Sequence, residues 1–456
     1  MTRIADPPTT TRWAPVVALA LAMVVVTSDL TIASIALPDI GQHFSVSPAD
    51  TAWVLLAYAL PMAAVAIPAG QWADRADVRR VFLLSMAGVA VSSLVAGLAT
   101  GFWMLLAARL FQGVAAALTM AVYMPIVASS VHTGQRGRAI GYVITIMTVG
   151  GLIGSPLGGL VTGTWGWRSV FLLKLPVVVA AVWVAWRSLG GDGRGLPVPS
   201  ARLWRGAAVM GGAMVALLSG VERLAESTAT GAVLLAISVA LFAAWLRLRD
   251  SRPLVGVLRG RVMGLTLLSL FLASMLVGLV SFLLPYFVTE RMGAGPEGLG
   301  LALLVFSGTI APVSPVAGWL ADRFGPHTVA LAGAVVTLAG LVGLLTLDGD
   351  AGLPDLMWRM AILGVGGGLF NGPVNTGLMA ATPPDMIGTA GGLFATVRTM
   401  ASTVAPAVTA LAWTTAGGGT AGFRAGVVVL AVGQAVSLLL LVAGRPRRGK
   451  AASGPA

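Results

Sequence analysis

Two oppositely charged residues, Asp29 and Arg109, lie within long apolar stretches of the sequence. A charge inside a bilayer is costly, so an ionisable residue there is a candidate functional residue. Asp29 lies about 12 Å of helical rise from the outer end of the first predicted helix, and Arg109 about 9 Å from that of the fourth. The hypothesis is that the two side chains share one depth and interact, and that Asp29 exchanges a proton between the two sides as its surroundings change. The structural alternative is a fixed ion pair that joins two helices.

Four further polar residues also fall within apolar stretches, namely Lys174, Asn371, Asn375 and Arg398. The long side chain of Lys174 either reaches toward the membrane interface or contacts a polar substrate. Asn371, Asn375 and Arg398 are expected near mid-membrane, where the asparagines can contact substrate or form hydrogen bonds between helices. We therefore predict a substrate cavity to which all four residues contribute.

The elements that position these residues are predicted to be membrane-spanning helices. Hydrophobic residues make up 57% of the 456 residues and charged residues only 10%, which excludes an ordinary soluble domain. A span needs about 20 mostly apolar residues. Such segments occur at 13–37, 50–72, 80–99, 103–131, 136–163, 168–189, 204–222, 230–248, 262–289, 298–321, 326–347, 355–381, 386–414 and 421–443. The prediction is fourteen helices, or twelve if the two weakest, between 204 and 248, are omitted.

The distribution of arginine predicts the orientation of the chain. Most arginines fall in alternate loops, and placing these loops and both termini in the cytoplasm follows the tendency of basic residues to stay inside. The first apolar segment is too long for a signal peptide and is expected to be retained. The net charge of +12 is spread over loops, so we expect no nucleic-acid partner. The absence of cysteine and three scattered histidines argue against a metal centre.

An internal repeat relates the two halves of the chain. Residues 70–75 read G-Q-W-A-D-R and residues 318–323 read G-W-L-A-D-R, each at the predicted cytoplasmic end of an even-numbered span. This placement predicts two parallel halves with two inserted helices between them. The loop charges can pair in one conformation and separate in another, or stabilise a static turn. The predicted switch residues are Gly70, Asp74, Arg75, Arg79, Gly318, Asp322 and Arg323.

The predicted fifth helix carries glycines at four-residue spacing, at Gly150, Gly154 and Gly158, with Gly159 adjacent. Small residues on one face allow close approach of helices in a membrane, and Pro156 favours a bend. We predict that this helix forms part of a gate between the two halves. Ordinary packing of membrane helices is the alternative.

Several of these segments resemble motifs of the major facilitator superfamily, in particular its fourteen-helix drug:proton antiporter branch. The cytoplasmic-loop motif G-x-L-a-D-r-x-G-r-k appears at 70–79, with Asp77 where glycine is usual. The matching first-, fourth- and fifth-helix motifs appear at 29–38, 109–113 and 154–159, with Ser34 for asparagine and the proline displaced from 155 to 156. Residues 167–176 resemble W-R-x-x-F-l-i-N-v-P, with Lys174 replacing asparagine.

The resemblance implies an all-α polytopic membrane protein that exports lipophilic, including cationic, drugs or antiseptics in exchange for protons. It would act as a monomer in the plasma (inner) membrane, with no cofactor and with the proton gradient as its energy source. The expected divisions are a six-helix bundle at 1–190, two inserted helices at 191–253, a second bundle at 254–445 and a cytoplasmic tail at 446–456. The alternatives are a dedicated exporter of one natural product or metabolite, a membrane-embedded enzyme and a non-transporting membrane protein.

Overall fold

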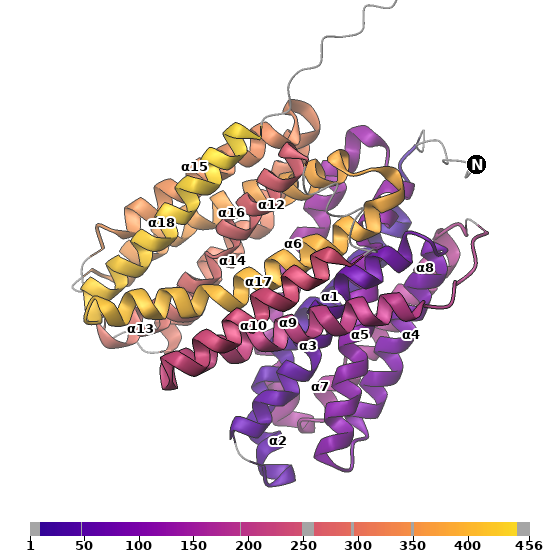
Figure 1. The fold of residues 1–456 in the computed structure, drawn as a ribbon, viewed down its shortest axis with the longest axis horizontal. Coiled ribbons are helices and arrows are strands. Elements are labelled where there is room, and N and C mark those ends of the chain that lie inside the picture. Colours follow the sequence, from indigo (N-terminus) through magenta and orange to yellow (C-terminus); the bar gives the residue numbers. More distant parts are fainter. Residues whose placement is uncertain are drawn as a thin grey trace, which may run out of the picture.

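The computed structural model describes residues 10–46, 48–191, 193–248, 260–292, 296–347 and 351–444, and these contain helices and no strand. Each of the fourteen predicted segments is helical within these residues. The helices of the first half are α1 (Trp13–Ile35), α2 (Leu37–Phe44), α3 (Pro48–Ala73), α4 (Val78–Gly97), α5 (Phe102–Ser130), α6 (Arg136–Trp165), α7 (Ser169–Leu172) and α8 (Leu175–Ser188). They form one bundle (Figure 1).

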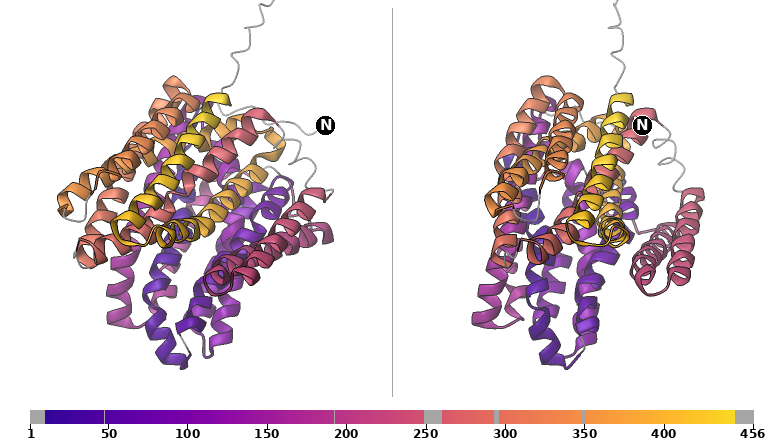
Figure 2. Two further views of the ribbon diagram at one scale, coloured as in Figure 1. Left: turned by 60° about the vertical axis from the view of Figure 1, so that its left-hand side comes forward. Right: turned by 90° about the vertical axis from the view of Figure 1, so that its left-hand side faces the viewer.

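A second bundle follows, and it lies beside the first (Figure 1). Its helices are α12 (Arg261–Ser274), the π-helical stretch Leu279–Leu283, α13 (Leu284–Glu290), α14 (Pro296–Phe324), α15 (Pro326–Leu344), α16 (Leu353–Ala381), α17 (Ile387–Thr415) and α18 (Gly419–Ala443). The start of α1 and the end of α18 lie at the same end of the molecule (Figure 2). An even number of crossings produces this arrangement.

Two inserted helices, α9 (Ala201–Glu226) and α10 (Thr228–Arg247), form a hairpin against the side of the molecule (Figure 2). Helix α9 packs on α3 and also contacts α17. The connection that precedes α9 is attached to the end of α3, where the Trp72 indole donates a hydrogen bond to the carbonyl oxygen of Pro197 (2.7 Å). The Arg194 guanidinium donates to the carbonyl oxygen of Asp74 (2.8 Å).

Ten helices in the described residues are long and apolar enough to cross a membrane by length and composition. Helices α6, α9, α16 and α17 are not among them, although each contains 26 to 30 residues. Glycine is frequent in α16 and threonine in α17, which lowers their hydropathy, whereas α6 and α9 include residues whose side chains lie outside the described ones. The all-helical membrane fold is as predicted, whereas the count of fourteen spans and the four divisions of the chain stay predictions.

Two departures from regular helix were not predicted, and one of them positions a functional side chain. The sixth predicted span is interrupted between α7 and α8, at Leu173 and Lys174. Pro176 lies in the first turn of α8, where its missing N–H and fixed φ are tolerated. The other is the π-helical stretch at Leu279–Leu283 within the ninth span.

Candidate functional site

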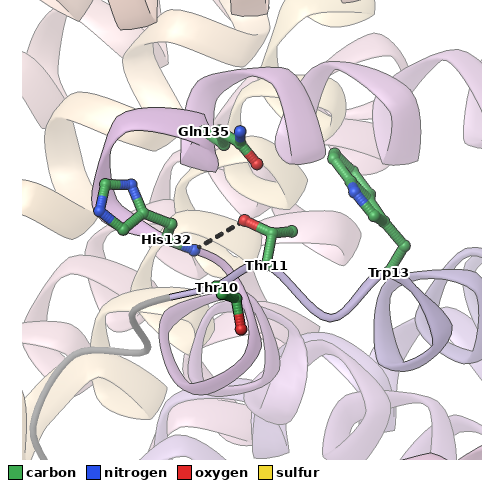
Figure 3. A pocket seen from close by; sticks show the side chains of 5 residues that line it. All are labelled: Thr10, Thr11, Trp13, His132 and Gln135. Atoms are coloured by element: carbon green, nitrogen blue, oxygen red, sulfur yellow. Dashed lines mark hydrogen bonds between the residues drawn. The ribbon is translucent and has the colours of Figure 1, made fainter.

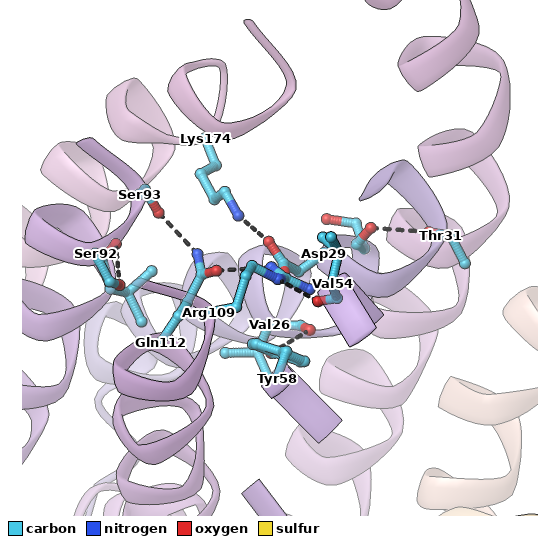
Figure 4. Close-up of polar contacts among 12 residues, drawn as sticks. Val26, Asp29, Thr31, Val54, Tyr58, Ser92, Ser93, Arg109, Gln112 and Lys174 are labelled. Carbon is cyan, nitrogen blue, oxygen red and sulfur yellow. Dashed lines mark hydrogen bonds and ion pairs between the residues drawn. The ribbon is translucent and has the colours of Figure 1, made fainter. Parts of the chain in front are cut away.

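Asp29 of α1 lies between two cations in the interior of the first bundle. The Arg109 guanidinium of α5 pairs through Nη1 with Asp29 Oδ2, and the Lys174 ammonium pairs through Nζ with Asp29 Oδ1 (Figure 4). Arg109 is 0% exposed, Asp29 4% and Lys174 9%. The predicted proximity of Asp29 and Arg109 is therefore present, with Lys174 as an unpredicted third member. We call these three residues the charge cluster.

Arg109 is held by groups from three helices. Its Nε donates to the carbonyl oxygen of Val54 (2.9 Å), and its Nη1 also donates to Gln112 Oε1 (2.7 Å). Gln112 in turn donates through Nε2 to Ser93 Oγ of α4 (2.8 Å). The Tyr58 ring lies 4.6 Å from the guanidinium carbon, within the range of a cation–π contact. Arg109 Nη2 is buried and has no hydrogen-bond partner.

A close approach of α3 and α5 brings Arg109 against the backbone of α3. A Cβ at Gly113 would lie 2.3 Å from the carbonyl oxygen of Tyr58, so any larger residue would force the helices apart. Tyr58 is itself anchored, because its hydroxyl donates to the carbonyl oxygen of Val26 on α1 (3.0 Å). The glycine of the fourth-helix motif thus positions the arginine of the same motif.

Lys174 does not reach toward the membrane interface, which corrects one of the two predicted interpretations. The interruption between α7 and α8 places Lys174 at the N-cap of α8 and directs its side chain to Asp29. Its Nζ also lies 5.4 Å from the centre of the Phe171 ring. The two paired residues are 145 positions apart in sequence, so no local pattern signals their contact.

Two hollows occur near the polar residues of the first bundle. A narrow gap, too small to hold a water molecule, borders the charge cluster and is lined by Val25, Val26, Asp29, Tyr58, Val89 and Gln112. A wider, open depression of about 430 Å³ is lined by Thr10, Thr11, Trp13, His132 and Gln135 (Figure 3). The second has no aspartate, glutamate, lysine or arginine in its lining, so the charge cluster is the better candidate for ion chemistry.

The predicted cavity residues of the second bundle are not brought to the charge cluster. Asn371 and Asn375 of α16 both donate to carbonyl oxygens one turn earlier on their own helix, each at 3.0 Å. Asn375 Oδ1 is buried without a hydrogen-bond partner. Arg398 of α17 is exposed and interacts electrostatically with Tyr123 of α5. Tyr123 lies 14 residues from Arg109, about 21 Å along α5.

Both repeated aspartates bind the N-terminus of a helix in the opposite bundle. Asp74 accepts hydrogen bonds from the backbone N–H groups of Gly388 (2.6 Å) and Thr389 (2.9 Å) at the start of α17. Asp322 accepts from the N–H groups of Gly137 (2.7 Å) and Arg138 (2.9 Å) at the start of α6. Unpaired N–H groups and the helix dipole make such an N-terminus an anion site. We call these two sets of hydrogen bonds the paired latch, and their end of the molecule the latched end.

Glycines allow the two bundles to touch at the paired latch. A Cβ at Gly70 would lie 2.3 Å from the carbonyl oxygen of Gly388, and a Cβ at Gly318 would lie 2.2 Å from that of Gly137. Real Cβ atoms do not approach backbone that closely, so both positions require glycine in this conformation. The close packing of α3 with α17 and of α14 with α6 depends on these contacts.

The arginines of the repeat do not form the latch. Arg75 and Arg323 are exposed, and the Arg323 guanidinium lies near the rings of Trp319 and Phe324. Arg79 donates to the carbonyl oxygen of Trp186 (2.9 Å) within the same bundle. The predicted pairing of loop charges is thus replaced by aspartates bound to helix N-termini, because backbone N–H groups reach the carboxylates directly.

The gate glycines of α6 were expected to face the second bundle, but Gly150 and Gly158 face α1. Gly150 packs against Val24 and Gly158 against Ile32, both on α1 of the same bundle. The close contacts of α6 with the other bundle are made by Gly137 and by Gly141, whose Cβ would lie 2.5 Å from the carbonyl oxygen of Ser314. Gly154, Pro156 and Gly159 belong to α6, but their side chains lie outside the described residues.

The latch is expected to respond to pH through Asp74. Burial raises the pKa of this carboxyl from 3.8 to about 6, although the hydrogen bonds from Thr389 and Gly388 act in the opposite direction. A carboxyl that binds its proton more tightly in the latched arrangement favours that arrangement as pH falls. Spin labels at Arg75→Cys and Arg323→Cys should report a larger latched population at about pH 5 than at about pH 7.5. Asp74→Asn should remove most of this change; an unchanged response would contradict this interpretation.

The chain is similar to known proteins over most of its length. A model of the Major Facilitator Superfamily matches residues 19–406 and 266–455. The tetracenomycin C resistance and export protein of Streptomyces glaucescens is 30% identical over 84% of this chain and 72% of that protein. The multidrug resistance protein Stp of Mycobacterium tuberculosis is 28% identical over 87% of this chain and 75% of that protein.

Solved structures show a similar arrangement of helices. The crystal structure of the human organic anion transporter MFSD10 (TETRAN) superposes with a TM-score of 0.68, over 94% of this chain and 99% of that one. Sequence identity is 16%, so the likeness concerns the fold.

Proposed function

Because the chain belongs to the Major Facilitator Superfamily, a family of transporters, we propose that it exports small lipophilic molecules, including cationic ones, in exchange for protons. Its relatives include a multidrug resistance protein and an antibiotic export protein, which supports drug or antibiotic export. The coupled ion is proposed from one observation, the carboxylate of Asp29 buried with Arg109 in the bundle interior. An intramembrane carboxylate of this kind is a typical proton-relay residue.

The paired latch supports a mechanism of alternating access. In this proposal the protein is a monomer in the plasma membrane. The latched end and both termini lie on the cytoplasmic side. The divisions 1–190, 191–253 and 254–445 then act as two moving bundles and an inserted hairpin, followed by a tail that lies outside the described residues. Binding of Asp74 and Asp322 across the bundles closes the cytoplasmic side, so the described arrangement faces outward. Rupture of both sets of bonds would open the other side.

In the proposed antiport, proton binding and substrate binding oppose each other at the charge cluster. Binding of a proton changes the net charge of the charge cluster. The strength of the ion pairs that Asp29 forms changes as a result. In the apolar interior such a change is large, because opposite charges interact strongly at low dielectric. Asn371, Asn375 and Arg398, which lie away from the charge cluster, are proposed to contact substrate later on its route.

Everted membrane vesicles test this function. Ethidium, a fluorescent lipophilic cation, should accumulate in vesicles that contain the protein when a proton gradient, acidic inside, is imposed. Collapse of the gradient with an uncoupler should abolish the accumulation. Vesicles from cells without the protein are the control, and equal accumulation in both would refute proton-driven export of this cation.

A second candidate function is dedicated export of one natural product, which the tetracenomycin C export protein among the relatives favours. Competition between ethidium and other compounds distinguishes the two functions. Several chemically unrelated drugs should each reduce ethidium accumulation if the site is broad, since an apolar site with few polar groups accepts many ligands. Inhibition by a single compound class would favour the dedicated exporter.

A further inference from the structure

The chain uses lysine at only two positions, against 27 arginines. One is Lys450, outside the described residues, and the other is Lys174 in the charge cluster. This choice has a chemical consequence. An arginine guanidinium keeps its proton in proteins, whereas a buried lysine ammonium can release one. Of the two cations on Asp29, Lys174 is the one able to change its charge.

The charge cluster holds one negative and two positive charges, so its net charge is +1. Protonation of Asp29 would remove the only negative charge and leave two buried cations next to each other. Loss of a proton from Lys174 would leave a neutral amine beside the Asp29–Arg109 ion pair, with a net charge of zero. Uncompensated charge in a buried site is strongly unfavourable. The change at Lys174 is therefore the less costly of the two.

The groups around Lys174 also indicate that loss of its proton costs less than protonation of Asp29. Asp29 of α1 and Arg109 of α5 are the charged groups of the cluster, and Tyr58 of α3 contributes a phenol that is bound to Val26. Helix α4 contributes Ser93, which accepts from Gln112, and α7 contributes the Phe171 ring. No second carboxylate is among the described contacts of the charge cluster. Asp29, bound by two cations, is the fixed counter-ion.

We propose that Lys174 is the residue that carries the exchanged proton and that Asp29 is its permanent counter-ion. The inference rests on the proposed proton-coupled export. When the cluster faces the cytoplasm, the Lys174 ammonium releases one proton there and becomes an amine, and a cationic substrate takes the position of its charge beside Asp29. When the cluster faces outward, the amine takes one proton from outside, and the restored ammonium returns to Asp29 and expels the substrate. The described arrangement, latched and with Lys174 on Asp29, is the stage after proton uptake.

Proton release on substrate binding tests this assignment. Purified protein in weakly buffered detergent solution is mixed with ethidium, and both binding and pH are recorded. The intact protein should release about one proton per ethidium bound, and its affinity should fall by up to about tenfold per pH unit as pH decreases. Lys174→Met should still bind ethidium but release no proton, and its affinity should become independent of pH. Lys174→Arg should also release no proton and should bind ethidium more weakly at every pH.

Lysine labelling gives a direct readout of the same event. In a Lys450→Arg background, protein labelled with [6-¹³C]lysine carries a single labelled side chain, that of Lys174. The ¹³C chemical shift of this side chain should change from the value of an ammonium group to that of an amine when ethidium binds at constant pH. Lys450→Arg alone should transport like the intact protein.

The outcomes separate this inference from the proposed function. Proton release that persists in Lys174→Met would overturn the inference and assign the proton to Asp29, while export remains proton-coupled. An unchanged Lys174 resonance during proton release would do the same. No ethidium binding, or binding without proton release by the intact protein, would contradict both.

Discussion

Gradient-driven efflux is expected to fall to background when Asp29 is replaced by Asn, while the protein still inserts into the membrane. Asparagine keeps the size of the side chain but removes the only negative charge of the charge cluster. Arg109 and Lys174 then lose their counter-ion, and no proton exchange can be balanced there. Efflux of ethidium per inserted protein should drop at least about tenfold, because the charge cluster has lost the negative charge that balances the exchanged proton.

Asp29→Glu is the matched control for this prediction, since it keeps the carboxylate and adds one methylene group. It should retain part of the gradient-driven efflux. The alternative, a fixed ion pair, predicts another pattern for Asp29→Asn: the amount of inserted protein and the efflux would fall together, with normal efflux per molecule. That pattern, or full efflux in Asp29→Asn, would show that Asp29 is not part of the coupling site.

A single methyl group at Gly70 is expected to prevent the latched arrangement. The Cβ of Gly70→Ala would lie 2.3 Å from the carbonyl oxygen of Gly388, so α3 and α17 must separate. Overpacking of this kind costs about 1–3 kcal/mol. The population of the open arrangement should therefore rise about 5- to 150-fold. Export should slow, because the outward-facing stage is reached less often.

The chain has no cysteine, so a single introduced cysteine can report this shift. Thr145 of α6 is suitable, because its hydroxyl donates to the carbonyl oxygen of Ala311 on α14 across the two bundles (2.7 Å). A maleimide should label Thr145→Cys faster when Gly70→Ala is present. Gly308→Ala on α14 is the control, since its Cβ would meet nothing within 4 Å. Equal labelling and transport in both glycine variants would contradict the role of Gly70.

Much of the fold could be predicted because membrane helices are specified by local composition. Every predicted span is helical, since about 20 apolar residues are needed to cross the hydrocarbon core. The repeat at 70–75 and 318–323 contains both aspartates of the latch, although not their partners. The similar depths of Asp29 and Arg109 follow from helical rise, whereas their contact also requires that α1 and α5 be neighbours, which depth does not establish.

Other features could not be predicted because they depend on tertiary contacts. Lys174, between α7 and α8, meets Asp29 of α1 through a contact between residues 145 positions apart in sequence. The partners of Asp74 and Asp322 are backbone N–H groups, which every helix N-terminus offers and no side-chain pattern marks. The glycine spacing on α6 indicates close packing but not the helix that packs there. Gly150 and Gly158 were predicted to face the second bundle, and they pack against α1.

Proton-coupled export is tested most directly with the purified protein in liposomes. An acidic interior is imposed by dilution into alkaline buffer, and entry of external ethidium is followed together with the internal pH. We expect ethidium to accumulate against its own gradient while the interior loses protons, and both changes to be absent with Asp29→Asn. Ethidium that enters at the same rate without a pH gradient, or with no loss of internal protons, would contradict antiport.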